Sequence, residues 1–191
     1  MRTVSLLTAL LSAALLAGCG GGGFAASALE ASGIRKPPEL PDAQKPPRQV
    51  LVRLHASGKL NADKHGQALA LAVRLYKLRR KDAFEQAPYS AFLTPDAERA
   101  SLGADLLEVR EIMLVPGQRY EVTEKVSHEA SHLAVVALFQ RPAEGRWRAT
   151  FPAEEAQRNG LTVGLHACAL TTNANAAGNA QAASLSSVRC Q

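Results

Sequence analysis

The sequence predicts a mainly β protein, built as a sandwich of two sheets with one short helical insertion. Stretches in which apolar and polar residues alternate recur from residue 50 onward, and this period is typical of half-buried strands. Turn-forming pairs that contain glycine separate these stretches: Ser57-Gly58, His65-Gly66, Pro116-Gly117, Glu144-Gly145 and Asn159-Gly160. Of the 191 residues, 47% are hydrophobic and 20% are charged, a composition that fits one globular domain.

The individual strands follow from the alternation and from apolar runs of strand length. We expect strands over residues 50–55, 69–76, 106–115, 119–126, 133–139, 146–151 and 161–169, and a last strand over 185–190. The stretch from about residue 81 to 103 interrupts this series, because its apolar residues are spaced as in one or two short helices. Thr94 or Asp96 would cap the second helix. Together these elements make up a predicted β-sandwich domain over residues 48–191.

The N-terminal segment has the pattern of a secretory signal. Arg2 gives a positive start, residues 4–16 form an apolar run, and small residues precede Cys19. A buried N-terminal helix is the alternative, but the glycines at 20–23 would break such a helix where its packing should continue. The sequence Leu-Ala-Gly-Cys at 16–19 resembles the lipobox of bacterial lipoproteins. This resemblance implies a lipoprotein signal peptide over residues 1–18 and lipid attachment at Cys19.

The residues that follow Cys19 indicate where the lipid would place the chain. Gly20 stands where an aspartate would favour the inner membrane, so the lipoprotein resemblance implies an anchor in the outer membrane, with the domain facing the periplasm. Burial of the acyl chains, at about 0.8 kcal/mol per CH₂ group, would hold the chain there. Residues 19–47 form a predicted linker that is glycine-rich and flexible at its start, and proline-rich and extended at its end.

Two cysteines remain for the domain itself, Cys168 and Cys190. In an oxidising periplasm two such thiols are expected to pair. The resulting disulfide would close a loop of about 20 residues and stabilise the domain by ~3 kcal/mol. Two free thiols are the alternative.

One stretch matches a catalytic motif. Residues 128–132 read His-Glu-Ala-Ser-His, and H-E-x-x-H on a helix places two histidines on one face for zinc, with the glutamate as general base. A zinc metallopeptidase that uses His128, Glu129 and His132 is therefore an alternative function. The motif stands between two predicted strands, however, and a hairpin turn over 127–131 would give the histidines no reason to converge. We expect the turn, and neither a metal nor a cofactor.

Other features argue against further classes of function. The motifs G-x-S-x-G, G-x-x-x-x-G-K-[ST] and C-x-x-C do not occur in the sequence, so we expect no enzymatic activity. A formal net charge of +5 with only 5% aromatic residues is a poor match to a nucleic-acid-binding protein.

Several short motifs occur in an order and spacing that resemble one family. They are Leu60-Asn61, Val73-Arg74-Leu75-Tyr76-Lys77-Leu78, Phe84, Ala87, Phe92-Leu93, Leu102-Gly103-Ala104-Asp105-Leu106, Pro116-Gly117, Val135-Val136-Ala137-Leu138-Phe139 and Trp147-Arg148. From about residue 50 to 148 the chain resembles the TssJ (VasD/SciN) family, the outer-membrane lipoproteins of the bacterial type VI secretion system. The resemblance implies a transthyretin-like two-sheet β-sandwich without enzymatic activity.

The same resemblance implies partners and a binding site. Members of the family dock the membrane complex by binding the periplasmic C-terminal region of the inner-membrane protein TssM, which in turn joins TssL. The loop between the first two strands is a partner-binding element in the family, and here it spans residues 57–67. The residues expected to bind are Lys59, Leu60, Asn61, Asp63, Lys64 and His65. A generic transthyretin-like lipoprotein that binds another envelope component is the alternative.

Overall fold

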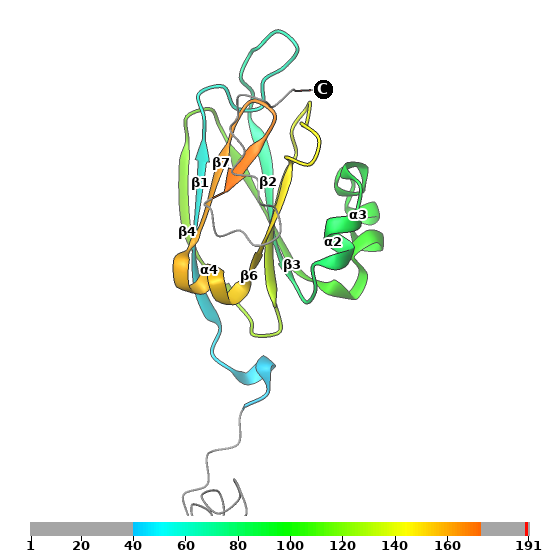
Figure 1. Ribbon diagram of the computed structural model, residues 1–191, viewed down its shortest axis with the longest axis vertical. Coiled ribbons are helices and arrows are strands. Elements are labelled where there is room, and N and C mark those ends of the chain that lie inside the picture. Colours follow the sequence, from blue (N-terminus) through cyan, green and yellow to red (C-terminus); the bar gives the residue numbers. More distant parts are fainter. Residues whose placement is uncertain (1–39, 173–189, 191) are drawn as a thin grey trace, which may run out of the picture. The chain divides into compact units, whose positions relative to one another are not determined.

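The computed structural model describes residues 40–172 and residue 190. It contains two four-stranded sheets with the strand orders β4-β1-β7-β8 and β3-β2-β5-β6 (Figure 1). The strands are β1 (Arg48–Ala56), β2 (Leu71–Leu78), β3 (Leu106–Leu114), β4 (Arg119–Val126), β5 (His132–Ala137), β6 (Arg148–Pro152), β7 (Leu161–Leu165) and β8 (Leu170–Thr172). The helices are η1 (Asp42–Gln44), α2 (Asp82–Gln86), η2 (Tyr89–Phe92), α3 (Pro95–Leu102), η3 (Gly103–Asp105) and α4 (Ala153–Asn159). The prediction of a mainly β, two-sheet sandwich is confirmed.

The alternation in the sequence decides which side of a strand is buried. In β1, Val50, Val52 and Leu54 are buried between the sheets, whereas His55 is exposed on the outer face. β1 pairs antiparallel with β4 and parallel with β7, so it lies in the interior of its sheet. The buried apolar side of each strand contributes to stability at about 25 cal/mol per Å² removed from water.

The predicted helical insertion covers the outer face of the second sheet (Figure 1). It explains why β2 has buried residues on both of its faces. The fully buried Tyr76 of β2 packs against Phe84 and Phe92 of the insertion, with ring centroids 5.4 and 5.9 Å apart. Arg148 of β6 donates a hydrogen bond of 2.7 Å from Nη1 to the carbonyl oxygen of Phe84. Aromatic packing and this charge-assisted bond therefore fix the insertion to the sheet.

The sequence analysis predicted the cap of α3 but did not predict the helix α4. Thr94 caps α3, because its Oγ1 accepts a hydrogen bond of 3.4 Å from the backbone N–H of Ala97. The helix α4 was not expected, although Pro152 and Gly160 flank it as helix boundary signals. α4 carries the chain from β6 in one sheet to β7 in the other.

The C-terminal part of the sandwich differs from the predicted strands. The stretch 161–169 was expected to be one strand, but β7 ends at Leu165 and β8 begins at Leu170. The two strands pair antiparallel, so the chain reverses direction between them. The predicted last strand at 185–190 lies outside the described residues, apart from Cys190. The predicted signal peptide and Cys19 also lie outside them.

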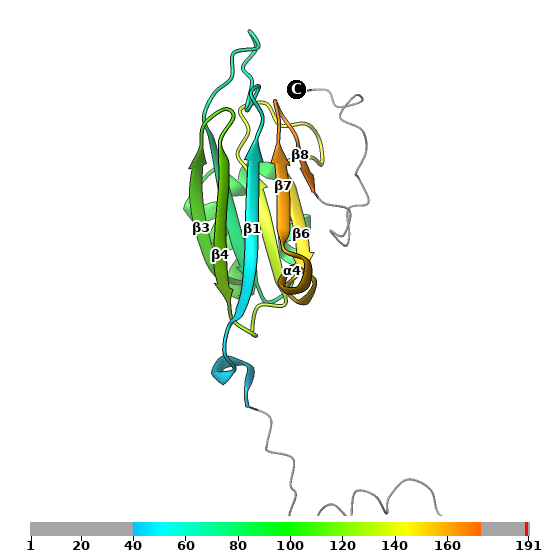
Figure 2. The same ribbon diagram turned by 90° about the vertical axis from the view of Figure 1, so that its left-hand side faces the viewer.

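β1 runs between two ends of the sandwich, which carry different parts of the chain. Residues 40–47 and the turn 127–131 lie where β1 begins, and we call this the tether end (Figures 1 and 2). The opposite end, the loop end, is formed by the connections 57–70, 115–118, 138–147 and 166–169. At about 3.3 Å per residue, the nine residues of β1 separate the two ends by roughly 25–30 Å. None of the helices in residues 40–172 is both long enough and apolar enough to cross a bilayer.

Candidate functional site

The candidate site is the connection 57–70, which joins β1 to β2 at the loop end. Its base is hydrogen-bonded to the connection between β7 and β8. The backbone N–H of Ser57 donates to Leu165 O (2.8 Å), and that of Ala62 donates to Ala167 O (2.8 Å). Leu60 is fully buried in the main hydrophobic core. The first half of this connection is therefore part of the folded domain and is not a free surface loop.

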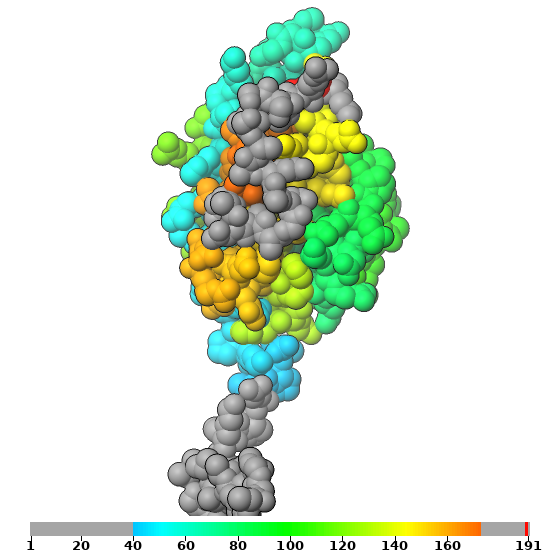
Figure 3. All heavy atoms as spheres, in the orientation of Figure 1, coloured from blue at the N-terminus to red at the C-terminus, as the bar shows by residue number. Residues whose placement is uncertain are grey.

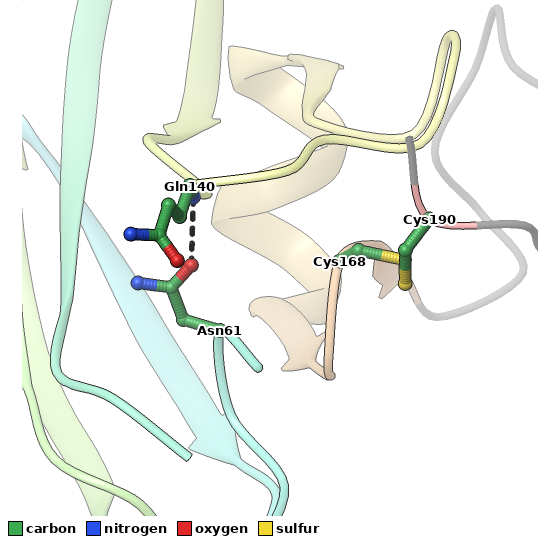
Figure 4. The surroundings of a disulfide bond; sticks show 4 residues. All are labelled: Asn61, Gln140, Cys168 and Cys190. Atoms are coloured by element: carbon green, nitrogen blue, oxygen red, sulfur yellow. Dashed lines mark hydrogen bonds between the residues drawn. A yellow bond between two sulfur atoms is a disulfide. The ribbon is translucent and has the colours of Figure 1, made fainter. Parts of the chain in front are cut away.

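Asn61 holds three connections of the loop end together. It is only 6% exposed, and its side-chain Nδ2 donates to Ala70 O at 2.8 Å, which closes the connection on itself. Its Oδ1 accepts a hydrogen bond of 2.7 Å from the backbone N–H of Gln140 (Figure 4), and its own N–H donates to His166 O at 3.0 Å. The backbone of Asn61 has φ +46°, a left-handed conformation that asparagine tolerates better than most residues.

The outer part of the connection forms a compact turn of its own. The backbone N–H of Asp63 donates to Gln67 O at 3.0 Å, and that of Gly66 donates to Asp63 O at 3.1 Å. The Asp63 carboxylate accepts hydrogen bonds of 2.8 Å from the N–H groups of both His65 and Gln67. The hydrogen bond from Gln67 is the main cause of a lowered Asp63 pKa. The carboxylate is thus used to shape the turn.

The structure divides the six residues of the predicted binding loop into two groups. Leu60 and Asn61 are buried and position the loop from inside the domain, and their contact with a partner stays a prediction. Lys59, Lys64 and His65 are exposed and face solvent. Half-buried Asp63 belongs to the turn that presents them.

A disulfide lies beside this site. Cys168 and Cys190 are joined, with a Cα–Cα distance of 5.5 Å and a sequence separation of 22 (Figure 4). Cys168 is buried with Ala143 and Ala169 in a small hydrophobic cluster of its own. The backbone N–H of Ala143 donates to Cys168 O at 2.9 Å, so the connection 138–147 is tied to the disulfide as well.

Sequence reasoning did not identify the connections 138–147 and 166–169 as part of the site. They meet 57–70 through backbone groups, and a backbone partner leaves no mark on residue type. The space-filling view shows 138–147 (yellow) at the same end as the teal connection 57–70 (Figure 3). The one sequence signal for this site was Asn61. Asparagine favours left-handed turns, and its side-chain amide can donate to one backbone group and accept from another that is distant in the sequence.

The H-E-x-x-H stretch forms the turn between β4 and β5, as predicted, and not the helix that zinc catalysis requires. His128 lies in this turn, whereas His132 is the first residue of β5. Ser131 Oγ donates its proton to Arg79 O, so His132 Nδ1–H donates to Ser131 Oγ at 2.8 Å. In residues 40–172 and 190, no three His, Cys, Asp or Glu side chains are grouped so that they could hold a metal ion.

The same turn holds the chain that leads into β1. His128 Nε2 lies 3.1 Å from Pro46 O, and because a carbonyl only accepts, the imidazole donates. Arg48 Nη1 donates to Ser127 O and Ala130 O, both at 3.3 Å. These contacts fix Pro46 and the first residue of β1 to the turn 127–131.

Comparisons with known proteins agree with this architecture. Residues 48–168 match the model of a family described as type VI secretion lipoprotein, VasD, EvfM and TssJ. The crystal structure of the type VI lipoprotein TssJ1 from Pseudomonas aeruginosa is 31% identical, with a TM-score of 0.59 over 67% of this chain and 96% of that chain. A search of curated protein sequences gives no match.

Two further solved structures share the fold at lower identity. A chain of a structure titled "Type VI membrane complex" is 24% identical, with a TM-score of 0.60 over 66% of this chain and 98% of that chain. A chain of a structure titled as the TssM C-terminal domain from EAEC is 21% identical, with a TM-score of 0.56 over 65% of this chain and 97% of that chain. On the family match and on the likeness to TssJ1, this chain belongs to the TssJ (VasD) family of type VI secretion lipoproteins.

Proposed function

We propose that the chain is an outer-membrane-anchored periplasmic lipoprotein that docks the type VI secretion membrane complex by binding the periplasmic C-terminal region of TssM. The lipid on Cys19 would supply the anchor, and the connection 57–70 would supply the contact. The observation that carries the proposal is the placement of this connection. It is fixed by a buried asparagine at the end of the sandwich opposite to the one where the tether joins.

The geometry of β1 supports a separation of anchoring from docking. Residues 40–47 join the sandwich at the tether end, and β1 leads from there directly into residue 57 at the loop end. A domain held by its tether end presents its loop end to components that lie farther from the anchoring bilayer. Attachment to the membrane also raises the effective concentration of a partner in the same narrow compartment, so an interface of modest affinity suffices.

The choice of TssM as partner is supported by the comparisons. Two of the structures that share this fold have titles naming the type VI membrane complex and the TssM C-terminal domain. The H-E-x-x-H stretch forms a turn, in which His128 bonds to Pro46 O and His132 bonds to Ser131 Oγ. We therefore propose a binding role and no enzymatic activity.

Fractionation and binding test the proposal together. Cys19→Ser should release the full chain from membranes, and Gly20→Asp should move it from outer-membrane to inner-membrane fractions. The full chain should also bind the purified C-terminal domain of its cognate TssM in a titration. If the Cys19→Ser variant stays attached to membranes, the proposed lipid anchor at Cys19 is wrong. If the full chain does not bind the TssM domain, the proposed docking role is wrong.

A further inference from the structure

We propose that the loop end carries a composite docking surface, with the apolar side chains of Met113 and Val115 at its centre and the lysines of the connection 57–70 at its rim. Its occupant is an acidic protein surface with an apolar centre. The inference rests on the proposed function, because it names the chemistry that the TssM domain would present to this end of the sandwich.

Two exposed apolar side chains, Met113 and Val115, lie beside the candidate loop. Five large hydrophobic residues of the described chain are exposed, and three of them, Val109, Met113 and Val115, lie on β3 or directly after it. Met113 and Val115 are 58% and 53% exposed. A single exposed apolar residue is ordinary, but several at one place indicate an interaction surface.

Hydrogen bonds join this apolar group to the connection 57–70. The backbone N–H of Gly117 donates to Ser57 O at 3.1 Å, and that of Ala56 donates to Gln118 O at 2.9 Å. The side chain of Gln118 in turn accepts a hydrogen bond of 2.9 Å from the N–H of Val115. The turn between β3 and β4 is therefore held against the base of the loop, and both connections lie at the same end of the sandwich (Figure 2).

The net charge of the described residues is concentrated at the same end. The connections of the loop end, together with Arg119 at the start of β4, carry five basic and two acidic residues: Lys59, Lys64, Arg119, Arg141, Arg146, Asp63 and Glu144. The other described residues include thirteen basic and thirteen acidic side chains, so they contribute no net charge. A surface with this excess of positive charge is complementary to an acidic partner.

The rim charges are available for an intermolecular contact. Among the ion pairs of the described residues, none involves Lys59, Lys64 or Arg119. Asp63, the acid nearest to Lys59 and Lys64 in the chain, already accepts two backbone hydrogen bonds within its turn. A polar rim around an apolar centre is the usual anatomy of a protein–protein interface.

Two other protein occupants fit the surface less well. A second copy that met the first one loop end to loop end would bring two positive surfaces together. Strand addition along the edge of β3 is opposed by charged residues that turn into the sandwich. Glu108 binds Lys77 at 2.8 Å, and Arg110 binds Glu124 at 2.6 Å. The occupant is therefore expected to cover the end of the sandwich.

The apolar centre is tested with a serine substitution and a matched control. The full-length lipidated chain, purified in detergent, is titrated with the C-terminal domain of its cognate TssM. Met113→Ser should weaken binding at least about tenfold, because a central apolar contact carries much of an interface's energy. Leu40→Ser alters a side chain of similar exposure, 53%, at the tether end and should change the dissociation constant less than about twofold.

The positive rim is tested by charge reversal. Lys64→Glu should weaken binding about tenfold at low salt, and the loss should shrink to about twofold near 0.5 M salt because the exposed charges are screened. Lys125→Glu makes the same charge change at an exposed position near the tether end of β4, and it should leave binding almost unchanged. Equal melting temperatures for all variants would show that the fold is intact.

Each outcome decides either this inference or the proposed function. Binding of the wild-type chain with no difference between the loop-end variants and their controls would overturn the composite surface and leave the docking role standing. Failure of the wild-type chain to bind TssM at all would overturn the docking role itself. Binding to anionic phospholipid vesicles that Lys64→Glu abolishes, while TssM binding is unchanged, would assign the positive charge to a membrane and overturn the inference.

Discussion

The two ends of the sandwich are held in different ways. At the loop end, a buried asparagine and a disulfide tie together connections that are far apart in the sequence. At the tether end, the start of β1 and the residue Pro46 before it are held to the turn 127–131 by hydrogen bonds from the half-buried side chains of Arg48 and His128 to backbone carbonyls. The Asn61 residue is itself buried and the disulfide is covalent, and a buried polar group costs more to leave without a partner than an exposed one. The loop end is therefore built to keep one shape, whereas the tether end has only to direct the chain.

The largest effect is expected where the loop end depends on one residue. Asn61→Ala removes two part-buried hydrogen bonds, to the carbonyl of Ala70 and from the N–H of Gln140, and places a Cβ-bearing residue without a polar side chain at positive φ. At about 1–3 kcal/mol for each unpaired group, we expect the free energy of unfolding to fall by about 3–4 kcal/mol. Urea denaturation of the variant and the wild type measures this difference.

A second variant separates the lost bonds from the backbone conformation. Asn61→Gly removes the same two side-chain hydrogen bonds but accepts positive φ without strain. Its loss of stability should be smaller than that of Asn61→Ala by about 1 kcal/mol. A loss below about 1 kcal/mol in both variants would mean that Asn61 does not hold the loop end together.

Removal of the disulfide should cause the next largest loss of stability. Cys190→Ser removes a cross-link that spans 22 residues, and the chain-entropy relation assigns about 3 kcal/mol to a loop of this length. The double variant Cys168→Ala with Cys190→Ser removes the free thiol that the single variant leaves, and it should lose a similar amount. Wild-type protein whose denaturation midpoint is unchanged by a strong reductant would contradict this expectation.

The sequence predicted the sandwich better than the site, and particular residues show why. The burial of Val50, Val52 and Leu54 is visible in the sequence because one side of a strand repeats every second residue. The burial of Leu60 and Asn61 is not periodic, since it depends on connections some eighty and more than a hundred residues further along the chain. Local pattern cannot show which distant backbone group will meet an asparagine.

For the H-E-x-x-H stretch, the flanking sequence predicted the local structure better than the motif itself. Its five residues could belong to a zinc-binding helix, but the strand-forming residues on both sides of it decide the local structure. Only the flanking alternation and the apolar run of β5 predicted the turn. For α4 the boundary signals were present in Pro152 and Gly160, but seven residues are too few for a helical period to stand out.

At the tether end the expected effect is smaller. Arg48→Ala removes hydrogen bonds from Nη1 to Ser127 O and Ala130 O, which are both 3.3 Å long and only partly buried. We expect the free energy of unfolding to fall by about 1 kcal/mol, measured by urea denaturation. Arg48→Lys keeps the charge without the planar group and should recover less than half of the loss. A loss as large as that of Asn61→Ala would erase the difference between the two ends.

The smallest effect concerns one half-buried histidine at each end, His166 at the loop end and His132 at the tether end. Burial lowers the pKa of both imidazoles below the ordinary value of 6.5, and the charge of Lys81 lowers that of His132 further. The unfolded chain therefore binds more protons than the folded one at pH values below about 6.5. The stability contributed by the neutral histidines is complete above that pH and is lost as the pH falls from there toward the folded-state pKa values.

This pH dependence sharpens the comparison because the two histidines have different neighbours. The melting temperature of the wild type should fall between pH 7.5 and 5.5, and His166→Gln and His132→Gln should each reduce that fall. Lys81→Gln should also reduce it, since removing the nearby positive charge returns the His132 pKa toward its ordinary value, while the contribution of His166 is untouched. If both histidine variants lose as much stability on acidification as the wild type, the effect arises from carboxylates, and the two ends do not differ in this respect.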